Sequence, residues 1–139
     1  MADIPETQKA YFAGFFDGEG CVAIYRKKYV ASLSNTDLRP LLAAQNIWGG
    51  HIAFVSSASR PAAVRDMWRW QIYGQNSAAF LEDIRPFTSV KSDQIDVYLE
   101  IIRIIPTRRG QRRRPGDAEI INFAANRLKS LKWGKELNV

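Results

Sequence analysis

The stretch YFAGFFDGEG, residues 11–20, carries an apolar helical pattern directly into two acids and two glycines. Asp17 and Glu19 fall at the carboxyl end of the expected helix, the negative end of its dipole, where an acid lowers stability. Gly18 and Gly20 predict a helix stop, because glycine accepts left-handed backbone geometry, but they do not explain the acids. A carboxylate beside the free carbonyls of a helix end forms a cluster of hard oxygen ligands suited to magnesium or calcium. An exposed acidic turn is the competing interpretation.

The same helix has a stripe of small residues on one side. Ala10, Ala13, Gly14 and Gly18 are related by spacings of three or four residues, so this side leaves room for another backbone to approach closely. Tight packing within the chain is one interpretation. A symmetric contact between two copies of the helix is the other, and it would bring two copies of Glu19 close to a twofold axis. Carboxylates that close repel one another unless metal ions lie between them.

Hydrophobic periodicity predicts the other elements as an alternation of helices and β-hairpins. After a first helix over 5–18, we expect strands at 21–27 and 29–34, a helix at 37–48, strands at 51–57 and 66–73, and helices at 77–84, 91–105 and 117–131. The arginine-rich segment 107–116 is expected to be a basic loop. This order predicts a single α+β domain over residues 1–139, with an αββαββα core, one antiparallel sheet and additional C-terminal helices.

Charge and composition favour a polyanionic partner. The 139 residues suffice for one domain with a modest core, and the formal charge of +6 comes largely from arginines. Arginine forks suit phosphates and guanine edges, although a solvated basic surface is the alternative. Cys21 and His51 are the only cysteine and histidine, which excludes a disulfide framework and a Cys/His zinc site and supports a reducing compartment.

The sequence contains no sign of a membrane protein. No apolar run reaches membrane-spanning length, and the first residues, MADIPETQ, resemble neither a signal peptide nor a transit peptide. We therefore expect a soluble protein with no membrane partner. The compartment itself, whether cytoplasm, nucleoid or organelle matrix, stays open.

Residues 12–20, FAGFFDGEG, resemble the LAGLIDADG motif of homing endonucleases position by position. The Ala-Gly pair, Asp17 and Gly20 are kept, aromatic residues stand at three apolar positions, and Glu19 replaces the final aspartate. The order of helices and hairpins is also similar to that family over almost the whole chain. Only one copy of the motif is present. In that family, single-motif chains form homodimers whose motif helices pack at the twofold axis and whose sheets form a saddle-like DNA-binding surface.

The resemblance implies a metal-dependent nuclease site at the end of the first helix. Glu19 takes the place of the metal-binding catalytic carboxylate, and the Gly18 carbonyl is a second metal ligand. Asp17 shapes the helix end. The implied cofactor is Mg²⁺, with Mn²⁺ or Ca²⁺ able to replace it in binding. The implied dimer interface comprises Ala10, Ala13, Gly14 and Asp17.

Two further segments supply polar and basic residues to the implied site. In SNTDLR, Asn35 corresponds to a polar residue that orders water near the scissile phosphate, and Arg39 to a basic residue at the pocket edge. Thr36 competes with Asn35, because a one-residue shift in the alignment exchanges them. Lys91, in RPFTSVKSDQ, corresponds to the family's active-site lysine before a long helix. A lysine is unfavourable at the positive end of a helix dipole, which favours a functional role over that of an ordinary surface lysine.

The two hairpins supply the expected DNA contacts. A two-stranded ribbon fits the major groove, where polar and basic side chains read base edges and others contact phosphates. The implied function is that of an intron-encoded homing endonuclease, an endodeoxyribonuclease that binds a long pseudo-palindromic DNA site as a homodimer and leaves a double-strand break with short 3′ overhangs. The alternative is an intron-RNA maturase, which would add intron RNA as a partner, or a non-cleaving DNA-binding regulator. The candidate DNA-contacting residues are Tyr25, Arg26, Lys27, Lys28, Ser32, Arg69 and Gln71.

Overall fold

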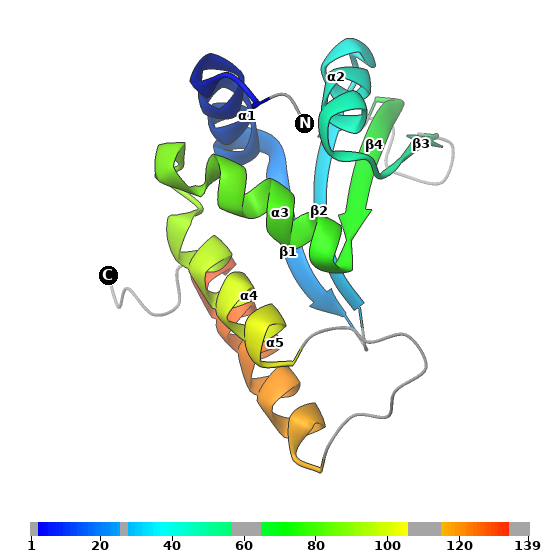
Figure 1. Ribbon diagram of the computed structural model, residues 1–139. Helices are drawn as coiled ribbons and strands as arrows, with labels where there is room; N and C mark the ends of the chain where they lie inside the picture. The colour runs from blue at the N-terminus through cyan, green and yellow to red at the C-terminus, as the bar shows by residue number, and fades with distance from the viewer. Residues whose placement is uncertain (1–2, 26–27, 57–64, 106–114, 134–139) are drawn as a thin grey trace.

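The computed structural model describes residues 3–25, 28–56, 65–105 and 115–133 (Figure 1). Helices and hairpins alternate in the predicted order. Most of the expected basic loop 107–116, together with Arg26 and Lys27, lies outside the described residues. The elements are α1 (Glu6–Glu19), β1 (Gly20–Tyr25), β2 (Lys28–Asn35), α2 (Arg39–Trp48), β3 (His51–Val55), β4 (Met67–Tyr73), α3 (Gly74–Ile84), the short 3₁₀ helix η2 (Arg85–Phe87), α4 (Ser92–Ile104) and α5 (Asp117–Trp133).

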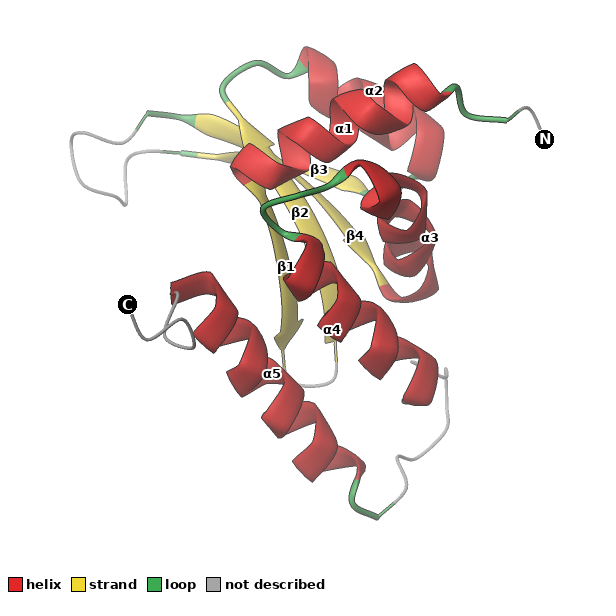
Figure 2. Cartoon of the chain, turned by 90° about the vertical axis from the view of Figure 1, so that its left-hand side faces the viewer, coloured by secondary structure: helices red, strands yellow, loops and turns green. Residues whose placement is uncertain are grey.

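The strands form one antiparallel sheet in the order β1-β2-β4-β3. Each hairpin pairs its own strands, and β2 pairs with β4 at the centre, with Val30 opposite Tyr73 and Asn35 opposite Trp68. Figure 2 shows α1, α2, α3 and α4 on one side of this sheet, with α5 beside β1 and α4. The α+β class with an antiparallel sheet is therefore confirmed.

The two faces of the sheet differ in burial, because side chains alternate between the faces along each strand. On the face covered by helices, Val22, Leu33 and Trp70 are completely buried. The opposite face is open and carries more polar side chains, as the sequence alternation predicts. In register across the four strands, this open face carries the row Cys21, Ser32, Gln71 and His51.

Aromatic packing holds α1 against the other helices and the sheet. Phe12 and Phe16 are buried, and the rings of Phe16 and Phe80 meet edge to face with centroids 5.7 Å apart. Phe80 also packs edge to face against Trp70, at 4.9 Å. Burial of each large apolar side chain contributes about 2 kcal/mol relative to exposure, so this cluster fixes the position of α1. The carboxyl end of α1 is thereby held at the edge of the sheet where β1 begins.

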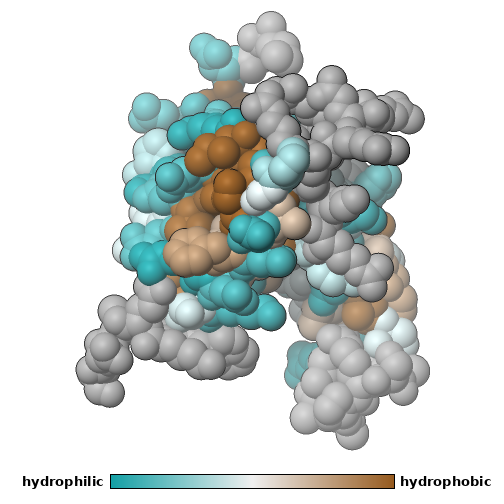
Figure 3. Space-filling model, turned by 90° about the horizontal axis from the view of Figure 1, so that it is seen from below, coloured by the Kyte–Doolittle hydropathy of each residue, from teal (hydrophilic) through white to brown (hydrophobic). Residues whose placement is uncertain are grey.

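Exposed apolar side chains gather where α4 ends and α5 begins. Ile104, Ile120 and Phe123 are all exposed there, and Figure 3 shows an apolar patch among hydrophilic side chains at this end of the molecule. This patch lies at the opposite end from α1. None of the helices in the described part of the chain combines the length and apolar character that a membrane crossing requires.

Candidate active site

The helix α1 runs into β1 without an intervening turn, since α1 ends at Glu19 and β1 begins at Gly20. The predicted left-handed helix stop is wrong, because Gly20 is extended (φ −80°, ψ 161°) and Gly18 is still helical. Gly20 is required for a different reason. A Cβ on this residue would overlap the Phe16 ring and lie 2.6 Å from the Phe16 carbonyl oxygen. The close contact of strand on helix places Glu19 directly at the corner of the sheet.

The carboxylate of Asp17 joins the end of α1 to the segment before α4. Asp17 Oδ2 accepts the backbone N–H of Ser89 at 2.8 Å, and Oδ1 accepts the backbone N–H of Lys91 at 3.0 Å. These amides lie at the amino end of α4, where the helix dipole favours an anion. The Asp17 carboxylate is therefore unfavourable for the dipole of α1 but favourable for the dipole of α4. These contacts are those of a residue that shapes the helix end.

Lys91 makes the reciprocal connection. It is the N-cap residue of α4, yet its side chain reaches the carboxyl end of α1, where Nζ donates to the carbonyl oxygens of Phe16 at 3.0 Å and Asp17 at 3.1 Å. The ammonium thus lies at the negative end of the α1 dipole, where a cation is stabilised. Partial burial lowers the pKa of Lys91 below its ordinary value, while the charges of Asp17 and Glu19 oppose this shift.

Glu19 differs from Asp17, because its side chain is exposed. Among the described residues, no hydrogen bond or ion pair holds the Glu19 carboxylate. The Gly18 carbonyl, one residue earlier, lies in the last helical turn, and the residue four positions later, Val22, already belongs to β1 and offers it no helical N–H. The carbonyls of Phe16 and Asp17 are bound by Lys91, so one free carboxylate and the carbonyl oxygen of Gly18 remain at the corner of the sheet. These groups are available to a ligand or to a second molecule.

Asn35 lies at the same end of the sheet as Glu19. Gly20 stands opposite Leu33, so Asn35, two residues after Leu33, lies beyond the start of β1 and shares the helix-covered face of β2. Asn35 Oδ1 accepts the backbone N–H of Asp37 at 2.8 Å. This bond turns the chain from β2 toward α2. The structure therefore places Asn35 on the same side of the sheet as α1.

Arg39 opens α2 and is held by Asp37. The Asp37 carboxylate accepts the Arg39 backbone N–H at 2.9 Å and also binds the guanidinium through Nε and Nη2. Hydrogen bonds from the Arg39 side chain lower the pKa of Asp37 to about 2, so the pair stays ionised at neutral pH. The Arg39 side chain is 88% exposed, and Thr36 is also exposed. Both residues can meet a bound molecule without a change in the fold.

Five of the expected DNA-contacting residues lie in the described strands on the open face of the sheet. Tyr25 and Lys28 stand opposite each other at the end of the first hairpin. Ser32 stands opposite Gln71, and Arg69 Nε donates to Ser34 Oγ at 3.3 Å in the next register position. Arg26 and Lys27 lie outside the described residues. The described members therefore share one face of the sheet, opposite the core.

The small-residue stripe of α1 is only partly exposed. Ala10 and Gly14 are exposed, and a Cβ on Gly14 or Gly18 would meet nothing within 4 Å. Ala13 is completely buried in the core, so it does not lie on the exposed stripe, contrary to the prediction. Asp17 is partly buried and engaged with the start of α4. The open part of the stripe is therefore Ala10, Gly14 and Gly18.

A known protein family matches the part of the chain that contains the motif and both hairpins. A family model described as a LAGLIDADG-like domain matches residues 6–85, more than half of the chain. The chain belongs to the LAGLIDADG family. Its matched region covers the motif helix, both hairpins and α3. Comparison with curated protein sequences gives no match.

Solved LAGLIDADG structures have the same fold as this chain. The homing endonuclease I-CvuI, in complex with the I-CreI target in the presence of magnesium, has a TM-score of 0.69 at 20% identity over 91% of this chain and 82% of that chain. The I-CvuI complex with its own target in the presence of calcium has a TM-score of 0.67 at 21% identity, with the same coverage. The archaeal intron-encoded homing endonuclease I-Vdi141I, in complex with DNA, has a TM-score of 0.54 at 16% identity over 92% and 98%.

One basic residue near the motif of this LAGLIDADG chain has no local signal in the sequence. Lys132, in the last turn of α5, places its Nζ 3.3 Å from Cys21 Sγ at the start of β1. Its charge also adds to the lowering of the Lys91 pKa, after the larger effect of burial. Lys132 is 111 positions from Cys21 and lies on a helix that reads as amphipathic, so no local signal marks it. Only the packing of α5 along β1 brings it to the motif.

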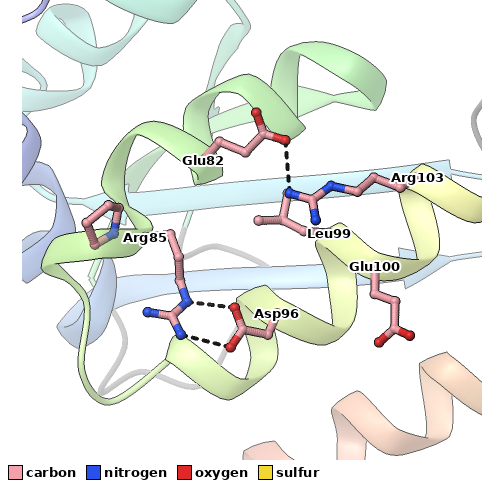
Figure 4. A pocket seen from close by; sticks show the side chains of 7 residues that line it. Glu82, Arg85, Asp96, Leu99, Glu100 and Arg103 are labelled. Atoms are coloured by element: carbon pink, nitrogen blue, oxygen red, sulfur yellow. Dashed lines mark hydrogen bonds and ion pairs between the residues drawn. The ribbon is translucent and has the colours of Figure 1, made fainter.

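A charged groove elsewhere on this LAGLIDADG chain carries none of the candidate residues. It has a volume of about 460 Å³ and lies between α3 and α4 (Figure 4). Arg85 binds Asp96 through two contacts of 2.6 and 2.8 Å, and Arg103 lies 3.4 Å from Glu82. These charges satisfy one another at the surface, where each such pair contributes about 0–1 kcal/mol. We assign the groove no role in the chemistry.

Proposed function

We propose that this chain is a site-specific, divalent-metal-dependent endodeoxyribonuclease that acts as a homodimer. The observation that carries the proposal is the contrast at the α1–β1 junction. Two backbone amides hold the Asp17 carboxylate, whereas the Glu19 carboxylate is exposed. An acid at the negative end of a helix lowers stability unless something compensates it. The presence of the Glu19 carboxylate at such a helix end, beside a polar sheet face, favours a role for Glu19 as a metal ligand.

Glu19 and the Gly18 carbonyl fit one side of a magnesium site. Within the described residues, no three or more His, Cys, Asp or Glu side chains gather closely enough to hold a metal ion. Magnesium usually takes six oxygen ligands and binds through one or two carboxylates plus substrate phosphates. The Glu19 of a second copy and the phosphates of DNA would complete such a set. When bound, the metal supplies Lewis-acid activation of water and phosphate, and Mn²⁺ or Ca²⁺ would replace Mg²⁺ in binding.

The open stripe of α1 supports the twofold arrangement. Ala10, Gly14 and Gly18 carry little or no side chain, so the backbones of two α1 helices can approach closely there. A twofold contact is self-complementary, because the same surface serves both copies. It would bring the two Glu19 carboxylates together and give one cutting site for each DNA strand.

The chain's own residues would hold and polarise the cut phosphate. Lys91 is anchored on the carbonyls of Phe16 and Asp17, so its positive charge stays beside Glu19 without reorganisation during the reaction. Asn35 uses Oδ1 for the Asp37 amide, which leaves Nδ2 to order water. Arg39 would contact a neighbouring phosphate from the start of α2.

The open face of the sheet would lie in the major groove on either side of the cut. Ser32, Gln71 and Arg69 stand in adjacent register positions, where side chains can reach base edges. Tyr25 and Lys28 would extend this contact at the end of the first hairpin. A homodimer that presents this surface twice requires a long pseudo-palindromic site, and cuts across the minor groove would leave short 3′ overhangs.

The decisive test is selection of cut sites from a randomised duplex DNA library in the presence of magnesium. We expect one family of nearly palindromic sequences, each cut once on both strands. Tight binding of a DNA site with no cutting in magnesium or manganese would contradict the nuclease and indicate a regulator. Preferential binding of intron RNA over duplex DNA would instead indicate a maturase.

Gly14→Leu is expected to weaken the homodimer at least tenfold, because four added carbon atoms would separate the two α1 backbones. The fold itself should be unaffected, since a Cβ at this position meets nothing within 4 Å. Sedimentation of the protein with and without DNA measures the effect. Asn122→Leu, which adds an apolar side chain to an exposed position of α5, is the matched control and should leave the dimer intact. Equal dimerisation of Gly14→Leu and the parent would contradict the twofold contact through α1.

Lys91→Met is expected to lower the cutting rate about thirtyfold, because a charged hydrogen-bond donor contributes roughly 2 kcal/mol. Methionine keeps the length and apolar part of the side chain but removes the ammonium. Single-turnover cleavage with saturating enzyme measures the effect. Thermal unfolding must be followed in parallel, because Lys91 also binds the end of α1. A rate within twofold of the parent would remove Lys91 from the proposed site.

A further inference from the structure

The end of α5 brings a second ammonium group to the motif. Lys132 lies in the last turn of this helix and donates from Nζ toward Cys21 Sγ at 3.3 Å. Figures 1 and 2 show α5 running beside β1 and α4, so its C-terminal end lies near the beginning of both elements. Both Cys21 and Lys132 are exposed. The ammonium is therefore held at the surface of the sheet corner.

The position of Cys21 shows where the Lys132 ammonium lies relative to the open face of the sheet, which is the proposed DNA-binding surface. Cys21 is two residues after Glu19 and stands opposite Ser32, which stands opposite Gln71. These side chains share the open face of the sheet. Lys132 thus lies beside the first member of this polar row, and Cys21 follows the free carboxylate of Glu19 by two residues along the chain.

The charge of Lys132 is not neutralised by its contact with the thiol. A cysteine sulfur is a weak acceptor, and an ammonium has three donors, so the contact with Cys21 orients Lys132 and leaves donors for a stronger acceptor. Asp17 is already engaged with two backbone amides. Burial is the main cause that lowers the pKa of Lys91, and the charge of Lys132 is near enough to add to that lowering. Two neighbouring cations beside one free carboxylate form a site for a further anion.

We propose that Lys132 binds a phosphate of the DNA strand that is cut next to Glu19 of the same subunit. This inference rests on the proposed function, because it requires duplex DNA over the open face. The phosphate would be one that neighbours the cut position on the side of β1, and Lys132 would fix the register of the strand over Glu19. Phosphate contacts position nucleic acid without reading its sequence. Lys132 is therefore a binding and positioning residue, distinct from the base-reading residues of the sheet.

The test is the salt dependence of DNA binding by Lys132→Ala in the full chain, measured in calcium on the selected site. Loss of one phosphate contact in each subunit should reduce the slope of log K against log salt by about 1.8 units per homodimer. Affinity near 0.1 M salt should fall about tenfold, and the fold-loss should be the same on unrelated duplexes. Lys132→Arg should restore most of the slope. Lys129→Ala, an exposed lysine one turn earlier in α5, is the matched control and should leave the slope within about 0.5 unit.

The outcomes separate the roles that Lys132 could have. An unchanged slope with a lower unfolding temperature would show that Lys132 only attaches α5 to β1, and would overturn the inference. Equal changes in the salt slope for Lys129→Ala and Lys132→Ala would indicate non-specific electrostatic attraction of DNA by α5. This result would also overturn the inference. Parent protein that binds no duplex DNA would overturn the proposed function together with this inference. If the parent protein cuts DNA and Lys132→Ala has the same salt slope as the parent, this inference alone would be overturned.

Discussion

Glu19→Gln is expected to leave the protein folded and able to bind its DNA site but to lower the cutting rate by at least about a thousandfold. The substitution replaces an anionic metal ligand with a neutral amide of the same shape, which removes most of the metal affinity at the cut phosphate. The fold should change by no more than about 0.5 kcal/mol, because the side chain is exposed and no described residue binds it. Single-turnover cleavage in magnesium measures the rate, and a gel-shift titration in calcium measures binding.

The control for this prediction is Glu100→Gln, the same chemical change at an exposed position of α4 that faces the α3–α4 groove. It should cut at the rate of the parent. Glu19→Gln protein that cuts as fast as the parent would remove Glu19 from the metal site. Loss of both DNA binding and the folded state would instead show that the acid is structural.

Gly20→Ala is expected to destabilise the fold by about 3 kcal/mol, the upper part of the range for overpacking a core. A Cβ at Gly20 overlaps the ring of Phe16, which is completely buried and packed against Phe80, so the ring has little room to move. The change corresponds to more than a hundredfold in the unfolding equilibrium. Urea unfolding followed by tryptophan fluorescence measures it, with unchanged m-values required for the comparison.

Gly18→Ala is the matched control, two residues earlier in the same motif. Gly18 is helical and a Cβ there meets nothing within 4 Å, so alanine should stabilise the unassembled chain by about 0.5–1 kcal/mol. The measurement belongs at a concentration where sedimentation shows monomers, because assembly would add to the apparent stability. Similar effects of the two substitutions would contradict the packing of β1 on Phe16.

The hydrophobic pattern and the motif were enough to predict the elements and the family. Alternation in residues 21–34 and 66–73 places Ser32 and Gln71 opposite the buried residues, because the period of a strand is two in any antiparallel sheet. Helical spacing locates α1, α2, α4 and α5 to within a few residues. These features depend on local geometry, which the side-chain pattern reports directly.

The tertiary structure decided which residues of the motif are buried, exposed or in close contact. Ala13 and Gly14 follow Ala10 by three and four residues, yet Ala13 is buried and the other two are exposed, because spacing alone does not say where the core lies. Gly20 reads as a flexible helix stop, but the close approach of Phe16 is the reason that glycine is needed there.

The acids and lysines of the site also show the difference between what the sequence predicts and what the tertiary structure decides. Asp17 and Glu19 both fall at the end of the motif helix, and in the sequence only the resemblance to the LAGLIDADG motif separates them. In the structure only Asp17 meets the backbone amides before α4, and its partner Lys91 lies 74 positions away. Lys132 reaches the motif from a further 41 positions along the chain (132 − 91). By itself, the sequence determined the fold, the family and the presence of an acid at the helix end. Only tertiary packing decided which acid is free and which cations surround it, because charge interactions depend on distance in space rather than along the chain.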